Sequence, residues 1–238
     1  MSDQVVLRVS ELHAHYGMSH ILRGVNLDLK KGHVISLLGR NGSGRSTAMK
    51  AIMGLVSPSA GRVLLNNIDL TGRRAFVICR AGIGYVPEER EVFLNLTVEE
   101  NLHMGILRRK GTAHEWTVDQ MFDYFPSLKE RRNTRAGSLS GGEQQMLTMC
   151  RTLLGNPQVM LIDEPTEGLA PMLVHMVGDM ICDINRKGVS VILVEQKLTI
   201  ALKVAHRVAV MGHGRIVFEG SPESLTANPA FMEEWLAV

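Results

Sequence analysis

Short runs of apolar residues predict strands in the first part of the chain. Apolar and polar positions alternate at Val5–Val9 and again at Val25–Leu29, which is typical of half-buried antiparallel strands. The continuous apolar run Val34–Leu38 predicts a further strand. Gly61–Leu65 and Ile83–Pro87 predict two more, the second short, buried and ended by its proline.

The pattern changes between Glu88 and about Pro157, where strand signals vanish and helical periodicity takes over. Thr97 and Glu100 have the spacing of a capping box, in which Thr97 accepts from the backbone N–H of Glu100 and Glu100 reaches back. One face of the helix that follows is lined by Leu102, Ile106 and Leu107. We expect this stretch to form a helical subdomain inserted into a chain of strands and helices.

A second helix is indicated by apolar and aromatic residues in front of Pro126, which is expected to stop it. These residues are Trp116, Met121, Phe122 and Phe125. Their helical spacing favours packing in a core over contact with a ligand.

Strands and helices alternate again after this stretch. Val159–Ile162 and Val189–Val194 predict buried strands, and Met172–Ile184 predicts a helix between them. The last expected elements are a closing hairpin and a short amphipathic helix: Val208–Met211, Arg215–Phe218 and Pro229–Val238.

Length and composition limit the class of protein. A chain of 238 residues suits one large domain, or a domain with an inserted subdomain. It has no uncharged apolar run of the ~18 residues that a membrane span needs, and its N-terminus lacks the pattern of a secretion signal. A net charge of +2 is too small to favour nucleic acid or anionic lipid as a partner.

The cysteines are odd in number, widely spaced and embedded in apolar stretches: Cys79, Cys150 and Cys182. This favours reduced, buried thiols over a metal site. The histidines show no pairing at metal-ligand spacing near a cysteine, so we expect no structural zinc.

A glycine-rich stretch lies between the strand Val34–Leu38 and a helix predicted over Ala48–Leu55. It consists of Gly39, Arg40, Asn41, Gly42, Ser43, Gly44, Arg45, Ser46 and Thr47. A strand, such a turn and a helix N-terminus form a phosphate cradle, because backbone N–H groups point inward and the helix dipole favours negative charge. Ser46 stands where a hydroxyl ligates Mg²⁺ in the pattern G-x-x-x-x-G-K-[ST], but Arg45 replaces its lysine.

A second helix N-terminus has the features of an anion site. Ser140 is a good N-cap, and Gly141 and Gly142 leave the first N–H groups uncovered. Two glycines in a first turn cost about 1 kcal/mol each in helix propensity, which a plain helix start does not explain. The helix itself is indicated by the spacing of Met146, Leu147, Cys150, Leu153 and Leu154.

Two carboxylates, Asp163 and Glu164, directly follow the apolar run Val159–Ile162. Open parallel sheets place ligands at the C-terminal edge of their strands, which favours a site over a solvated turn. Asp163 can hold the water shell of Mg²⁺, and Glu164 can orient and deprotonate an attacking water.

The order of these pieces resembles the nucleotide-binding subunit of an ATP-binding cassette (ABC) transporter over essentially the whole chain. The most specific piece is Leu139–Gln144, with the sequence Leu-Ser-Gly-Gly-Glu-Gln. The resemblance implies an α/β fold in one ABC ATPase domain: a P-loop nucleotide-binding core with an antiparallel β subdomain and an inserted helical subdomain. Residues 1–87 and 158–238 would form the core, and residues 88–157 the helical subdomain.

In this family two subunits face head to tail and enclose two ATP molecules, and hydrolysis works the membrane subunits. The resemblance implies that residues 39–47 hold the ATP phosphates, with Ser46 and Asp163 at the Mg²⁺. Ser140, Gly141 and Gly142 would contact the γ-phosphate of the ATP bound to the partner chain.

Further roles follow from the same resemblance. Tyr16, in a turn predicted at His15–Gly17, would stack on adenine rather than be only a half-buried turn residue. Glu88 stands where the family usually has the glutamine of the loop that contacts the metal and the membrane subunit. Glu164 matches the catalytic base, and Gln196 occupies the switch position that is usually a histidine.

Several stretches resemble the second ATPase subunit of branched-chain amino acid importers: Tyr85–Arg90, Leu96–Leu102, Gly168–Pro171 and Val194–Gln196. Closely similar subunits serve urea and short-chain amide importers. The resemblance implies a second ABC ATPase subunit, in a homo- or heterodimer, and two membrane permease subunits. It also implies an indirect partner, a periplasmic solute-binding protein, and a peripheral location on the cytoplasmic face of the inner membrane.

Arg45 keeps the charge of lysine but has a broader planar fork that cannot fill the same small volume. We expect a chain that binds ATP and hydrolyses it slowly at its own loop, because misplacement in phosphoryl transfer can cost about 100-fold. The alternatives are a non-hydrolysing nucleotide sensor, a variant engineered to trap ATP, and a structural subunit that binds no nucleotide. A soluble ABC protein of DNA repair or translation is disfavoured, since the chain lacks a long insertion and a second cassette.

Overall fold

The computed structural model describes residues 4–107 and 115–236. Its central element is a six-stranded sheet in the order β10-β9-β3-β8-β7-β6, parallel except for β10, which pairs antiparallel with β9. The strands are β3 (Val34–Leu38), β6 (Ile83–Val86), β7 (Val159–Asp163), β8 (Ser190–Val194), β9 (Arg207–Gly212) and β10 (Arg215–Gly220). Every strand that the sequence predicted for this sheet is present.

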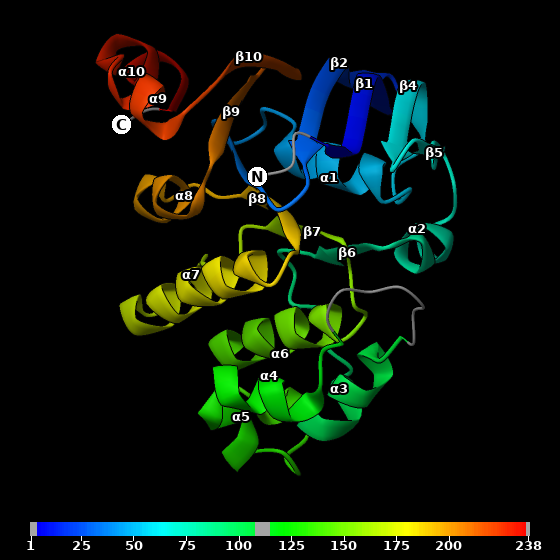
Figure 1. Cartoon of the computed structure of the whole chain (residues 1–238), viewed down its shortest axis with the longest axis vertical. Helices are drawn as coiled ribbons and strands as arrows, with labels where there is room; N and C mark the ends of the chain where they lie inside the picture. The colour runs from blue at the N-terminus through cyan, green and yellow to red at the C-terminus, as the bar shows by residue number, and fades with distance from the viewer. Residues whose placement is uncertain (1–3, 108–114, 237–238) are drawn as a thin grey trace.

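A second, antiparallel sheet has the order β2-β1-β4-β5. Its strands are β1 (Val5–Tyr16), β2 (Ser19–Lys30), β4 (Pro58–Leu65) and β5 (Ile68–Asp69). Helix α1 (Arg45–Ile52) packs between this sheet and the large one, with contacts to β1, β2 and β7 (Figure 1).

The first two strands are longer than predicted, at 12 residues each. The pairing of β1 with β2 shifts register between Val9 and Leu12, and Glu11 has a φ of 46°. This irregularity interrupts the alternation of apolar and polar residues, so the pattern predicts only part of β1. The predicted turn at His15–Gly17 is wrong at its start, because β1 continues through Tyr16.

The remaining helices cover the other face and the ends of the large sheet. They are α2 (Ala75–Ala81), α3 (Val98–Gly105), α4 (Val118–Tyr124), α5 (Pro126–Glu130), α6 (Gly141–Leu153), α7 (Pro171–Arg186), α8 (Leu198–Val204), α9 (Pro222–Thr226) and α10 (Pro229–Leu236). Helices α3 to α6 lie together below the large sheet in Figure 1, on the side away from the antiparallel sheet. The α/β fold class, with its antiparallel sheet and helical elements, is confirmed.

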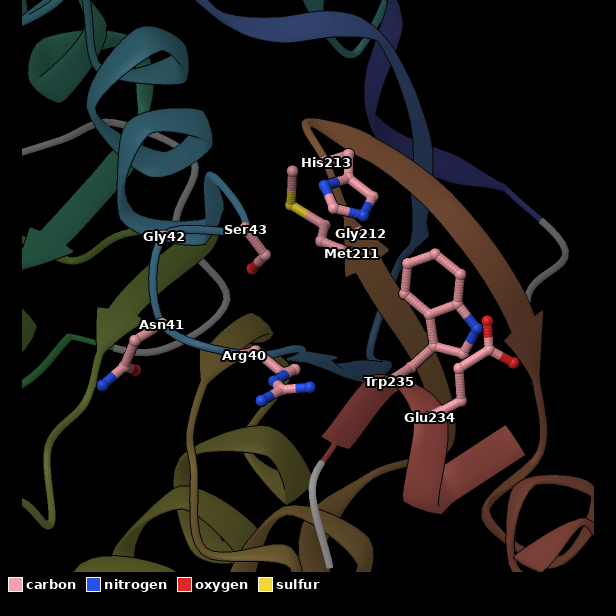
Figure 2. Close-up of a pocket in the computed structure, with 9 residues that line it drawn as sticks. All are labelled: Arg40, Asn41, Gly42, Ser43, Met211, Gly212, His213, Glu234 and Trp235. Atoms are coloured by element: carbon pink, nitrogen blue, oxygen red, sulfur yellow. The ribbon is translucent and has the colours of Figure 1, made fainter. Parts of the chain in front are cut away.

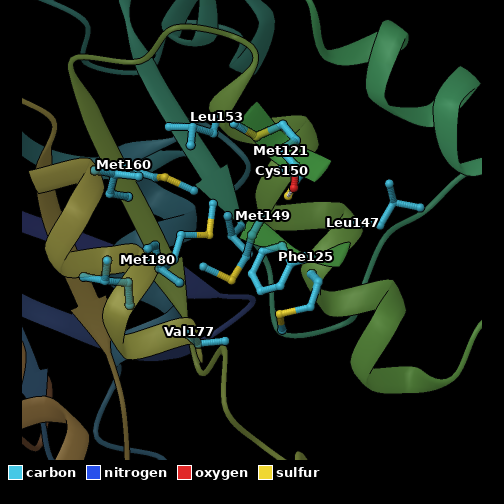
Figure 3. Packing of buried hydrophobic residues seen from close by; sticks show 14 of the residues in the cluster. Met121, Phe125, Leu147, Met149, Cys150, Leu153, Met160, Val177 and Met180 are labelled. Carbon is cyan, nitrogen blue, oxygen red and sulfur yellow. Dashed lines mark hydrogen bonds between the residues drawn. The ribbon is translucent and has the colours of Figure 1, made fainter. Parts of the chain in front are cut away.

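Strands β3, β6, β7 and β8 place side chains in two buried clusters, one on each face of the sheet. Ile35 and Leu161 pack with residues of β1, β2 and α1, whereas Val34 and Met160 pack with residues of α6 and α7. Because both faces are covered, these strands are apolar at nearly every position. Figure 3 shows the second cluster, where methionines from β7, α4, α6 and α7 meet.

The capping box of α3 is confirmed, with Thr97 accepting from the backbone N–H of Glu100 and Glu100 accepting from that of Thr97. The predicted face of this helix is wrong at its end, because α3 stops at Gly105. Ile106 lies beyond the helix and is exposed, and Leu107 follows it.

The second predicted helix is α4, which begins only after Trp116. Thr117 caps it with a second capping box that the apolar pattern did not predict. The helix ends at Tyr124, and Pro126 is the first residue of α5, where its missing N–H costs nothing. The aromatic residues Trp116, Phe122 and Phe125 are buried in the core as expected.

At the end of the chain, α10 spans Pro229–Leu236, and residues 237–238 of the predicted helix lie outside the described residues. The three cysteines form no disulfide, as predicted. Cys150 is buried, but Cys79 and Cys182 are only half-buried, so the prediction of burial is wrong for these two. Within residues 4–107 and 115–236, no helix is both long enough and apolar enough to cross a membrane.

One polar contact ties the lower helices to α7. The Tyr124 hydroxyl of α4 donates a hydrogen bond to the Asp183 carboxylate, and Lys187 pairs with the same carboxylate at 2.9 Å. The hydrogen bond from Tyr124 is the main cause that lowers the pKa of Asp183 below its usual value, and the bond from Lys187 is the next. A carboxylate with a lowered pKa stabilises the folded state at higher pH, and this contribution is lost as the pH falls through the lowered pKa.

We therefore expect Tyr124→Phe to lower the free energy of unfolding by about 1 kcal/mol at neutral pH. The deficit should shrink once the pH is below the 3.8 of an unperturbed aspartate, because protonation weakens the bond in the parent protein too. Denaturant unfolding of both proteins across this pH range measures the effect. Asp179→Asn, on the exposed face of α7, is the control and should change stability by less than about 0.5 kcal/mol. A deficit that does not vary with pH contradicts the assignment.

Candidate functional site

The glycine-rich loop joins β3 to α1 and is held against the β9–β10 turn. The amide of Gly214 donates to the carbonyl of Ser43 at 3.0 Å. At Gly39, with φ 147°, an added Cβ would lie 2.4 Å from the carbonyl oxygen of Met211, so only glycine fits there. Helix α1 begins at Arg45 and not at Ala48 as predicted. The first helical turn therefore belongs to the loop itself.

Beside this loop lies a cavity of about 280 Å³. Its lining consists of Asn41, Gly42, Ser43, Gly44, Arg45, Ser46, Thr47, Glu88, Glu164, Glu167 and Gln196. The structure thus brings most of the predicted phosphate loop together with the predicted base, the switch residue and Glu88. We call this space the loop cavity.

A second cavity, of about 320 Å³, lies between the same loop, the end of β9 and α10 (Figure 2). It is lined by Arg40, Asn41, Gly42, Ser43, Met211, Gly212, His213, Glu234 and Trp235. Of the loop residues that line this second cavity, Arg40 is the one that does not also line the loop cavity. Glu164 lines the loop cavity but not this second cavity, so the loop cavity is the candidate site for phosphate chemistry.

Asp163, at the end of β7, receives hydrogen bonds from two hydroxyl groups. Ser46 donates to its Oδ1 at 3.0 Å and Tyr85 donates to its Oδ2 at 3.2 Å. Burial raises the pKa of Asp163, and both hydrogen bonds oppose that rise. Tyr85 was not predicted as a site residue, because its role depends on the pairing of β6 with β7.

The oxygens of Ser46 and Asp163 are the hard donors that Mg²⁺ prefers, so these residues fit the ion. Among the described residues, no three His, Cys, Asp or Glu side chains form a metal-binding group of their own. Mg²⁺ commonly uses one or two protein ligands and completes its shell with phosphate oxygens and waters. This donor set suits a metal that arrives with a nucleotide.

Glu164 is held at both carboxylate oxygens. Arg45 Nη2 lies 3.0 Å from Oε1, and Gln196 Nε2 donates to Oε2 at 2.7 Å. The side chains of Arg45 and Glu164 are 5% and 7% exposed. Burial raises the pKa of Glu164, while the Gln196 hydrogen bond and the Arg45 charge oppose the rise.

Two further carboxyl groups, Glu88 and Glu167, both line the loop cavity and share a hydrogen bond. Burial is the main cause that raises the pKa of Glu88, followed by the bond to Glu167 and its charge. The sequence analysis did not predict Glu167 as a site residue. Its position in the cavity depends on how the segment after β7 folds back.

The predicted second anion site is built as expected at its N-cap. Ser140 accepts from the backbone N–H of Glu143, and Glu143 accepts from that of Ser140. Neither Ser140 nor Gly141 nor Gly142 lines the loop cavity of the same chain.

Gly141 instead lies against Arg90, a residue that the sequence did not indicate. An added Cβ at Gly141 would lie 2.0 Å from Nη1 of Arg90, whose Nη2 donates to the carbonyl of Glu167 at 3.0 Å. One side chain therefore bridges the start of α6 and the segment after β7. No local pattern could have shown this, since the three residues are far apart in sequence.

Tyr16 ends β1 and is half exposed. It does not line the loop cavity. Its ring is therefore accessible, as a residue that stacks on a ligand must be.

A sequence profile of the family described as ABC transporter matches residues 22–167, which is more than half of the chain. The chain belongs to the ABC transporter family. The predicted resemblance is thereby confirmed, and with it an ATP-binding subunit that hydrolyses ATP.

Two relatives match nearly end to end. The high-affinity branched-chain amino acid transport ATP-binding protein BraG of Pseudomonas aeruginosa is 38% identical over 97% of this chain and 99% of its own length. The probable branched-chain amino acid transport ATP-binding protein LivF of Archaeoglobus fulgidus is 35% identical over 95% of this chain and 96% of its own.

Solved structures agree with the fold. A nucleotide-free ATP-binding cassette from an ABC transporter superposes with a TM-score of 0.81 at 27% identity, covering 94% of each chain. The ADP conformation of the cassette MJ1267 gives a TM-score of 0.79 at 27% identity, covering 97% of this chain and 98% of that one. This ABC subunit thus has the architecture of cassettes seen with and without nucleotide.

The contact of Gly141 with Arg90 generates a testable expectation. Gly141→Ala should displace the Arg90 guanidinium, a shift that a flexible side chain can make without unfolding the protein. Because small displacements in phosphoryl transfer can cost up to about 100-fold, we expect a roughly 10- to 100-fold loss of ATPase rate. Steady-state phosphate release, with thermal unfolding as the check on folding, measures this. In an Arg90→Ala background the same glycine change should have little further effect, and full activity of Gly141→Ala contradicts the assignment.

Proposed function

We propose that this chain is the ATP-binding subunit of an importer of branched-chain amino acids. The observation that carries the proposal is the end-to-end match to two relatives, both named for branched-chain amino acid transport. An importer of urea or short-chain amides is the alternative substrate class, because the motifs of this chain fit those subunits as well.

The residues at the loop cavity support distinct roles in ATP hydrolysis. Residues 39–47 would hold the phosphates, and Ser46 and Asp163 would hold Mg²⁺, with Glu88 nearby. Mg²⁺ supplies charge neutralisation at the phosphate oxygens when it is bound. Glu164 would orient and deprotonate the attacking water, with Gln196, 2.7 Å from its carboxylate, positioning that group.

A head-to-tail dimer is supported by the distance between two parts of the site within one chain. Ser140, Gly141 and Gly142 form the start of α6 but do not line the loop cavity of their own chain. In a dimer they would contact the γ-phosphate bound to the partner, a second ABC ATPase subunit that is identical or related. Tyr16 would stack on the adenine. We propose residues 88–157 as the helical subdomain that carries the signature.

An exposed apolar groove supports a membrane-subunit partner. It measures about 440 Å³, and three of its large side chains, Phe76, Phe93 and Met104, are each about half exposed. Apolar surface of this kind marks a site of protein association. Glu91 and Phe93 line it and directly follow the loop that contains Glu88. We propose that the groove receives an apolar segment of a membrane permease subunit.

The assembly would then contain two ATPase subunits and two permease subunits on the cytoplasmic face of the inner membrane. A periplasmic solute-binding protein would act with it indirectly, and no nucleic acid would take part. A second candidate function, favoured by Arg45 alone, is a regulatory subunit that binds ATP and hydrolyses it poorly.

Uptake measurements test the transport proposal. Loss of the gene should abolish uptake of labelled leucine, isoleucine and valine and leave urea uptake unchanged. The intact chain should restore uptake, whereas Phe76→Ser should reduce it about 10-fold by weakening the permease contact. Ile68→Ser, which changes an exposed residue outside the groove, is the matched control. Loss of urea or amide uptake alone would support the alternative substrate instead.

The effect of Arg45 is tested by Arg45→Lys. A lysine ammonium is compact and reaches the phosphates as a point charge, so we expect the steady-state ATPase rate to rise by up to about 100-fold. Parent and variant should be compared at saturating MgATP. Equal rates contradict slow turnover by the parent and also remove the case for a regulatory subunit.

A further inference from the structure

Arg45 and Glu164 form an ion pair that is closed off from solvent. Arg45 lies in the first turn of α1, Glu164 directly follows β7, and Nη2 and Oε1 are 3.0 Å apart. Gln196 occupies the other oxygen of Glu164. Both oxygens of the group proposed as the base are therefore bound to side chains of its own chain.

The remaining partners of the Arg45 guanidinium are neutral. Nη2 also lies 3.3 Å from Oδ1 of Asn41, and Nη1 lies 3.5 Å from the carbonyl of Glu195. Glu164 is thus the only anion that pairs with this guanidinium among the described residues. A guanidinium stays protonated at any physiological pH, so it always requires a counter-charge when buried.

A nucleoside triphosphate in the loop cavity would require the same cation. Arg45 lines the cavity together with the loop amides, at the position from which the family's lysine reaches the phosphates. The planar fork of arginine forms directed hydrogen bonds, which it can make to a carboxylate or to a phosphate oxygen. Two anions therefore compete for one set of donors.

We propose that Arg45 binds the Glu164 carboxylate in competition with the phosphates of a nucleoside triphosphate, so that nucleotide binding releases Glu164. The inference rests on the proposed binding of ATP in the loop cavity. Arg45 is then a positioning residue for Glu164, which regains a free oxygen for an attacking water only after the phosphates have taken the guanidinium. By linkage, any factor by which the Arg45–Glu164 pair is strengthened lowers the affinity for the nucleotide by the same factor.

The test is a cycle of nucleotide affinities, measured by calorimetry with Mg²⁺ and a non-hydrolysable ATP analogue. The four proteins are the parent, Glu164→Gln, Arg45→Lys and the double variant. Glu164→Gln removes the charge-assisted hydrogen bond that competes with the nucleotide. In the parent background this change should therefore tighten binding of the analogue by about 10-fold. In the Arg45→Lys background, where the directed fork is gone, the same change should give about twofold or less.

Two controls separate pairing from overall charge. Glu167→Gln removes a carboxylate from the same cavity, but one that bonds to Glu88, and should tighten binding about twofold or less. Glu164→Asp keeps the charge and withdraws the carboxylate by one methylene, so tighter binding there reports lost pairing alone. This variant also keeps the test decisive if Glu164→Gln does not fold.

The outcomes are distinct. The competition is overturned, with ATP binding left intact, if Glu164→Gln and Glu167→Gln increase nucleotide affinity equally. It is also overturned if Glu164→Gln increases affinity equally in the parent and in the Arg45→Lys protein. Binding by none of the variants, Arg45→Lys included, overturns both the competition and the proposed function. A gain that depends on Arg45 supports the competition.

Discussion

The parallel pairing of β3, β8 and β7 is the constraint on which the site depends. Leu37 of β3 and Asp163 of β7 both lie in register with Val194 of β8, so the three strands end at one edge of the sheet. The phosphate loop follows β3, Asp163 ends β7 with Glu164 directly after it, and Gln196 comes two residues after the end of β8. Side chains that are more than 100 residues apart therefore meet because their strands share one hydrogen-bonded register.

This edge gathers more negative charge than positive charge in a partly closed space. Burial raises the pKa of Asp163, Glu164 and Glu88 alike. The desolvation penalty of such groups falls when a cation lies beside them. Arg45 supplies that charge for Glu164 within the chain, whereas Asp163 is held by two neutral hydroxyl groups and can accept a metal ion. The same arrangement makes Arg45 the counter-charge of Glu164 and, in our proposal, puts Glu164 in competition with the nucleotide phosphates for that cation.

Features governed by local rules were predicted well, and features governed by distant contacts were not. The capping box at Thr97 and the N-cap at Ser140 satisfy N–H groups within one helical turn, so short sequence spacing was enough to predict them. The start of α1 was missed by three residues, because its first turn is also the phosphate loop and carries no apolar periodicity. The second half of β1 was missed because the irregular register near Glu11 breaks the alternation that a strand pattern requires.

The sequence by itself determined the fold class, the phosphate loop, the two carboxylates and the signature, since each depends on residue types at short spacing. It also showed that Arg45 stands where lysine is usual. Only the tertiary structure decided what Arg45 contacts, that Glu167 enters the loop cavity, and that Tyr85 and Arg90 belong to the site. These contacts join strands and loops that are distant in sequence, and their distances are fixed by sheet register and packing rather than by any local pattern.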